Sequence, residues 1–167
     1  MTQHLVAERL RREASCELVF DQIRTAGGGL FKVSGGSMLP ALWPGDLVTV
    51  ERLSIDDLLP GQIVQFRQKE NLIVHRVLRV TNGHLVARGD SLPCCDPPVA
   101  ESNVVGRVVS IERNGRLVGL EQSLPQRIVA AVLRRSGRLR RITMILGSDE
   151  PLAQLRDLGK TWLPWAS

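Results

Sequence analysis

The sequence lacks any apolar run that approaches the about 18 residues a membrane-spanning helix needs. Its first 17 residues, MTQHLVAERLRREASCE, are charged throughout and have no apolar centre, so they do not fit a secretory signal. Hydrophobic residues make up 43% of the 167 positions, close to the share in ordinary globular domains. A chain of this length can bury a core of its own, so we expect one domain with a terminal appendage and no membrane span.

Cysteine is also scarce, with only Cys16, Cys94 and Cys95. An odd count that includes two adjacent cysteines is a poor disulfide framework. The sequence has no CxxC pair, and no histidine stands near the cysteines at zinc-ligand spacing. We therefore expect neither a metal nor another cofactor, and a reducing compartment, the cytoplasm.

Acidic residues become rare toward the C-terminus. Residues 1–125 carry 14 Lys and Arg against 14 Asp and Glu, whereas residues 126–167 carry 8 against 3, so the tail supplies the net charge of +5. A basic tail favours an anionic partner such as membrane lipid or nucleic acid. Of these two partners we expect peripheral contact with a membrane rather than with nucleic acid. An equal alternative is that the arginines have no partner and form a solvated helix face.

The patterning divides the chain into three parts. We expect residues 1–29 to form a helical segment, because apolar positions recur along one face of 3–26 until three glycines end the pattern. We expect residues 122–167 to form a basic helical extension, in which Ile128, Val129, Val132 and Leu133 share a face and five arginines follow between positions 134 and 141. A second short helix is predicted over 149–160.

Between these flanks, residues 30–121 carry short β-branched runs separated by Gly, Pro, Asn and Asp. TNGH at 81–84 and RNGR at 113–116 each place Asn-Gly between apolar runs, the strongest short signal for a hairpin. The sequence therefore predicts a mainly β, mostly antiparallel domain over these residues.

Four motifs follow one another along this β segment. They are Ser37-Met38-Leu39-Pro40 with Gly45-Asp46, then PGQIVQF at 60–66, then Ile73-Val74-His75-Arg76-Val77, and finally Arg88-Gly89-Asp90-Ser91 with Asp96 and Val105-Gly106-Arg107-Val108. In this order they resemble the signal peptidase I family, within the larger group of serine peptidases that includes the LexA-like repressors. The resemblance covers about residues 30–112 and implies a coiled antiparallel β-sheet peptidase fold.

The third motif indicates the subtype. Bacterial signal peptidases I and LexA-like proteins have a lysine base there, whereas the endoplasmic-reticulum and archaeal type has histidine followed by arginine, as in His75-Arg76. The resemblance thus implies Ser37 as nucleophile and His75 as general base. It also implies that Asp90 and Asp96 are both functionally important, with Asp96 the better candidate for orienting the histidine.

The chemistry of these residue types agrees. A serine hydroxyl needs an adjacent base, a histidine titrating near neutrality can take its proton, and a carboxylate on the other ring nitrogen orients the ring. The predicted substrate and oxyanion contacts are Gly36, Ser37, Met38 and Pro40, with the Ser37 N–H as oxyanion donor. Gly35 stands where signal peptidases usually carry a serine that adds an oxyanion hydroxyl, and Gly-Asp-Ser-Leu replaces their usual Gly-Asp-Asn-Asn.

Each of these residues also has a plainer interpretation. Ser37 beside glycine suits a turn, and His75 in an apolar run suits a structural strand position. Asp90 and Asp96 in a proline-rich loop suit turns, as does Asp46. Cys94 and Cys95 could be thiol nucleophiles, but no histidine stands beside them in the sequence.

Three functions are consistent with these motifs. The first is a serine endopeptidase that cleaves a peptide or precursor protein. The second is a LexA-like regulator that cleaves itself, since Ala26-Gly27 resembles the Ala-Gly bond of such proteins, although it lies only eleven residues before Ser37. The third is a peptide-binding module without catalysis on the same fold, because a fold alone does not determine function.

Overall fold

The β-branched runs form one eight-stranded antiparallel sheet in the part of the chain that the structure describes. The structure is a computed structural model, and it describes residues 25–121 and 123–136 together with positions 18, 20, 21, 23, 139 and 143. The strands are β1 Gly28–Lys32, β2 Leu47–Glu51, β3 Ile63–Gln68, β4 Asn71–Thr81, β5 His84–Arg88, β6 Val99–Ala100, β7 Val104–Arg113 and β8 Arg116–Val118. Two 3₁₀ turns, η1 Ile55–Asp57 and η2 Glu101–Asn103, and one helix, α2 Leu124–Arg135, complete these elements.

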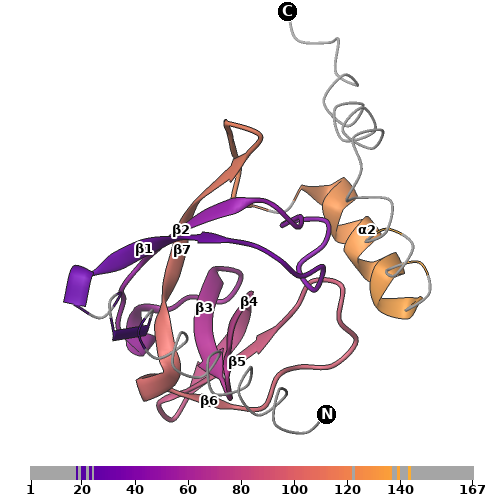
Figure 1. Ribbon diagram of the computed structural model, residues 1–167. Helices are drawn as coiled ribbons and strands as arrows, with labels where there is room; N and C mark the ends of the chain where they lie inside the picture. The colour runs from indigo at the N-terminus through magenta and orange to yellow at the C-terminus, as the bar shows by residue number, and fades with distance from the viewer. Residues whose placement is uncertain are drawn as a thin grey trace, which may run out of the picture.

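The strands are arranged in the order β1-β2-β7-β3-β4-β5-β6, and β8 pairs with β7. Figure 1 shows β1 and β2 at a steep angle to β3, β4 and β5, so that the sheet coils. Register shifts at Thr49/Val50 in β2 and at Gln65/Phe66 in β3 bend it where β7 pairs with both. The prediction of a mainly β, coiled antiparallel fold is confirmed.

Both Asn-Gly pairs form the predicted hairpin turns. Asn82 and Gly83 have φ of 50° and 67° and join β4 to β5, and Asn114 and Gly115 have φ of 51° and 75° and join β7 to β8. Two successive residues in the left-handed region match the twist of a two-residue hairpin, which is why Asn-Gly is favoured there.

The buried side chains fall into two clusters. One cluster joins β2 and β7 to Met38 and Leu42, which follow the predicted nucleophile, and to Phe20 near the N-terminus. The other lies over β3, β4 and β5 and includes Val64 and Phe66. Each cluster thus supports a different part of the predicted site, since Met38 follows Ser37 in the chain and the Phe66 ring contacts His75.

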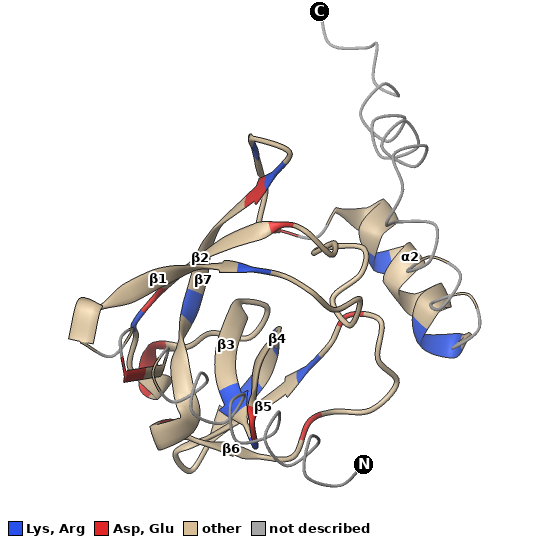
Figure 2. Ribbon diagram, in the orientation of Figure 1, with Lys and Arg blue, Asp and Glu red and all other residues tan. Residues whose placement is uncertain are grey.

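Helix α2 begins with Ser123, whose N–H donates to Gln126 Oε1 at 3.0 Å. It packs inward through Ala130 and Leu133, while other apolar side chains of the helix remain exposed. The blue segments of this helix in Figure 2 are arginines, and no red of Asp or Glu lies on it. None of the helices within the described residues is long and apolar enough to cross a membrane.

Several predictions concern residues that the structure does not describe. The predicted helix over 3–26 lies mostly outside the described residues, and the one over 149–160 lies entirely outside them. The division into parts at 29 and 121 stays a prediction, although the strands do lie between Gly28 and Val118.

Candidate active site

Ser37 lies in the turn that follows β1 by five residues. The next residues form a helical turn, in which the Leu42 N–H donates to the Met38 carbonyl at 3.0 Å. Met38 and Leu39 are fully buried, so this turn is anchored in the core and leaves Ser37 partly exposed at its start. The Met38 side chain is thus a core residue, and the half-buried Pro40 accepts a hydrogen bond at its carbonyl from Trp43 Nε1.

His75 is buried in the middle of β4, directly opposite Val64 of β3. Its ring meets the edge of Phe66 at a centroid distance of 6.0 Å and an interplanar angle of 65°. Its Nε2 lies 3.0 Å from Ser37 Oγ, and its Nδ1 lies 2.6 Å from Asp96 Oδ2. The structure therefore brings together three of the four predicted catalytic side chains.

The partners of the two ring nitrogens determine where the proton is. A carboxylate can only accept hydrogen bonds, so Asp96 requires a proton on Nδ1. In the neutral ring Nε2 is then an acceptor, and it can take the hydrogen bond of the Ser37 hydroxyl. This arrangement can remove the serine proton and stabilise the imidazolium that forms.

Asp96 lies in the loop between β5 and β6, where its own N–H donates to the Ala87 carbonyl at 2.9 Å. This bond ties the loop to β5 and directs the carboxylate toward the ring. The neighbouring Cys94 and Cys95 are free and exposed. The hydroxyl of Ser37, not a thiol, makes the hydrogen bond to His75.

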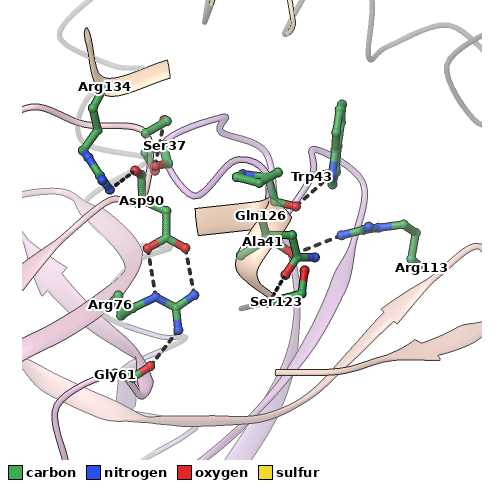
Figure 3. A network of polar contacts seen from close by, with 12 residues as sticks. Ser37, Ala41, Trp43, Gly61, Arg76, Asp90, Arg113, Ser123, Gln126 and Arg134 are labelled. Carbon is green, nitrogen blue, oxygen red and sulfur yellow. Dashed lines mark hydrogen bonds and ion pairs between the residues drawn. The ribbon is translucent and has the colours of Figure 1, made fainter. Parts of the chain in front are cut away.

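Asp90 makes a different contact from Asp96. Its two carboxylate oxygens accept from Arg76 Nε and Nη2 at 2.9 and 2.8 Å, and Arg76 Nη1 also donates to the Gly61 carbonyl at 2.6 Å (Figure 3). Consecutive strand residues point to opposite faces of a sheet. His75 and Arg76 can therefore each hold one aspartate, and it is Asp96 that bonds the ring.

Comparison with known families agrees with this fold and geometry. A model of the Peptidase S24-like family matches residues 7–109, more than half of the chain. The chain belongs to the Peptidase S24-like family. No curated protein matches the sequence significantly. Membership supports a serine peptidase-like or self-cleaving fold for this chain.

In this Peptidase S24-like chain, Ser91 holds the loop that carries Ser37. Its N–H donates to the Ser37 carbonyl at 2.9 Å, and its hydroxyl lies 2.9 Å from the carbonyl oxygens of both Gly36 and Ser37. Gly89 makes this approach possible, since a Cβ there would lie 2.6 Å from the backbone carbonyl oxygen of Ser37. We missed the contribution of Ser91 in the sequence, where the Gly-Asp-Ser-Leu motif was its only signal.

The other end of the loop that carries Ser37 is fixed by Asp46, whose carboxylate accepts from the Trp43 N–H at 2.8 Å and from Arg113 Nε at 2.8 Å. This agrees with its reading as a structural turn residue. Gly35 is exposed, and a Cβ added there would meet nothing within 4 Å. The position where signal peptidases usually carry serine therefore has room for one in this Peptidase S24-like chain.

Proposed function

We propose that this chain is a serine endopeptidase that resembles signal peptidase I of the Ser-His type and cleaves a peptide or precursor protein. The observation that carries the proposal is the continuous path from Ser37 Oγ through His75 to Asp96, with contacts of 3.0 and 2.6 Å. Three segments far apart in the sequence supply these side chains, and the His75 side chain is buried.

In the proposed reaction, Ser37 Oγ attacks the scissile carbonyl carbon while His75 Nε2 takes the hydroxyl proton. The tetrahedral oxyanion accepts a hydrogen bond from the Ser37 N–H, and Asp96 stabilises the imidazolium. His75 then gives its proton to the leaving amine as the C–N bond breaks. A water molecule repeats the sequence on the acyl-enzyme and restores Ser37.

We propose that the substrate lies extended along β1. This strand pairs only with β2 among the described strands, and it leads into the Ser37 loop. Its Leu30 side chain is 63% exposed. An extended peptide adds to a free strand edge through main-chain hydrogen bonds. The family resemblance implies small residues at the cleaved bond.

The contacts at Gly27 favour a separate substrate over cleavage of the chain's own Ala26-Gly27 bond. The Gly27 N–H donates to the Ile23 carbonyl, and its carbonyl accepts from the Arg52 N–H, both at 2.9 Å. These hydrogen bonds hold the bond at the start of the sheet, where β1 pairs with β2. Self-cleavage would first have to break them.

A serine-reactive covalent probe tests the proposal, with turnover of a peptide library as a second readout. We expect Ser37→Ala and His75→Ala to lose both labelling and turnover, because one removes the nucleophile and the other its base. The exposed Ser34 provides a matched control, and Ser34→Ala should keep both. Labelling that persists in Ser37→Ala would refute the assignment. Folded wild type without labelling or turnover would favour the binding module, and fragmentation at residue 26 or 27 would favour self-cleavage.

We also propose peripheral membrane contact through α2. The side chains of Leu124, Ile128 and Val132 are 72%, 66% and 50% exposed, and this helix carries basic but no acidic residues. Apolar and basic side chains together suit the interface of an anionic bilayer. The excess of positive charge in residues 126–167 adds to the attraction toward an anionic bilayer.

Flotation with vesicles tests this contact in the full chain. We expect wild type to float with anionic vesicles and less with neutral ones, and Ile128→Ser with Val132→Ser to reduce flotation. Leu117→Ser changes an equally exposed side chain, 79% accessible on β8, and should leave flotation unchanged. Equal flotation of all variants, or none of wild type, would contradict the proposed contact.

A further inference from the structure

Four arginines and one aspartate line a small cavity beside α2. Its volume is about 190 Å³, and the residues that line it come from β4, β5, the loop after β5 and α2. They are Arg76, Leu78, Arg88, Asp90, Arg127 and Arg134. It does not include the Ser37 hydroxyl, so it is distinct from the site of the proposed cleavage.

The positive charges in this cavity exceed what its one carboxylate can balance. Asp90 already receives two hydrogen bonds from Arg76. Arg134 Nη1 donates to the backbone carbonyl of Asp90 at 3.0 Å, which brings a second guanidinium to the same residue without a charge partner in that bond (Figure 3). The Nε of Arg88 is buried and has no hydrogen-bond partner among the residues that the structure describes. A buried donor without a partner costs free energy, so the arrangement favours an added acceptor.

We propose that this cavity binds a phosphate group. Guanidinium groups form paired hydrogen bonds with phosphate oxygens, and several of them from different elements can surround a tetrahedral anion. A water molecule occupies about 30 Å³ in the liquid, so 190 Å³ holds a phosphate group with a few waters. The bound group supplies the acceptor that Arg88 Nε lacks and balances the charge of Arg127 and Arg134.

The bound phosphate joins α2 to the segment that supports the nucleophile. Arg127 and Arg134 lie on α2, whereas Arg88 ends β5 and directly precedes Gly89. The Asp90 carbonyl that receives Arg134 is followed by Ser91, which holds the Ser37 carbonyl. A phosphate that bridges these arginines therefore stabilises α2 on the body and the Asp90 segment together.

Calorimetric titration of the full-length protein with inorganic phosphate at low salt tests the site, with chloride as the comparison anion. We expect saturable binding that Arg88→Gln weakens by about tenfold or more, because a charge-assisted donor is lost. The control Arg116→Gln removes the same charge from the exposed β7–β8 hairpin and should change the affinity less than about twofold. If Arg88→Gln does not fold, Arg127→Gln, whose side chain is exposed, takes its place.

A competition experiment identifies where the phosphate comes from. We test whether wild type binds vesicles of phosphatidic acid and whether inorganic phosphate displaces them. Displacement by phosphate, together with loss of vesicle binding in Arg88→Gln, would identify a lipid headgroup as the source. Saturable phosphate binding without such competition would identify a soluble phosphate-bearing ligand. The proposal is refuted if wild type shows no saturable binding, or if Arg88→Gln and Arg116→Gln weaken it equally. Binding is measured without any peptidase assay, so its failure is separate from failure of the proposed cleavage.

Discussion

Asp96 and Asp90 lie six positions apart in one loop but make different contacts, and paired substitutions separate their roles. Asp96 contacts the His75 ring, and Asp90 forms a paired salt bridge with Arg76. Replacing each aspartate by asparagine preserves side-chain shape and removes the charge. We expect Asp96→Asn to lower kcat and Asp90→Asn to lower the melting temperature.

The expected size of the Asp96→Asn effect follows from the 2.6 Å contact. The new amide can donate to Nδ1, which moves the ring proton to Nε2, so the ring can no longer accept the Ser37 proton. The same change in a serine-histidine-aspartate site elsewhere lowers kcat by about 10⁴. Replacement of the charge-assisted hydrogen bond by a neutral one should cost about 1 kcal/mol of unfolding free energy, which is about 2–4 °C in a chain of this size.

Asp90→Asn should have a large effect on the melting temperature and a small effect on kcat. The Asp90 and Arg76 side chains are 6% and 13% exposed, so removal of one charge leaves the other buried without its partner. Breaking such a pair costs about 3–5 kcal/mol. The retained amide oxygen favours the lower end, and about 3 kcal/mol corresponds to a fall of about 6–12 °C. At a temperature where the variant is folded, most of kcat should remain.

Steady-state turnover of a peptide selected from a library, and thermal unfolding followed by circular dichroism, measure both quantities on the same samples. Retention of more than about a tenth of wild-type kcat in Asp96→Asn would refute the proposed role of Asp96 in holding the proton on His75 Nδ1. A large loss of kcat in Asp90→Asn with an unchanged melting temperature would move Asp90 into the reaction instead.

Three substitutions around the loop that carries Ser37 give further predictions. Gly35→Ser has room for its side chain, so we expect an unchanged melting temperature and, if the hydroxyl reaches the oxyanion, a kcat that rises by up to about 10²-fold; lower thermal stability would show that the position is not open. Gly89→Ala brings a Cβ within 2.6 Å of the backbone carbonyl oxygen of Ser37 and should lower both stability and turnover. As a control, Gly119→Ala places a Cβ where no atom lies within 4 Å, so it should lower neither. Ser91→Ala removes a hydroxyl donor from this loop and should cost about 1–3 kcal/mol in chemical denaturation, and a smaller cost would mean that the Ser91 N–H alone holds the loop.

The strands and their hairpins could be predicted from local signals. Alternation of β-branched and polar residues depends on the two faces of a strand, and Asn-Gly supplies the left-handed conformations that short hairpins need. Ser37, His75 and Asp96 could also be named in advance, because their motifs occur in a recognisable order. These signals depend on a few neighbouring residues or on the family pattern.

Other contacts depend on how distant segments meet and could not be predicted. The resemblance implies a functional role for Asp90, but no local signal indicates that its carboxylate binds Arg76, as it does in the fold. In α2, Ile128, Val132 and Leu133 share a face by periodicity, yet only Leu133 of these is buried. Arg134 belongs to a basic run in the sequence, but in the fold it donates to the Asp90 carbonyl.

The wide separation of the Ser37, His75 and Asp96 side chains along the chain has a consequence for biosynthesis. His75 lies 38 positions from Ser37 and 21 from Asp96, and the sheet that joins them includes β7, which follows all three. A nascent polypeptide still emerging from the ribosome thus holds an isolated serine, with no base beside it to remove its proton. The arrangement of Ser37, His75 and Asp96 is therefore assembled only after β7 has been synthesised and has paired with β2 and β3.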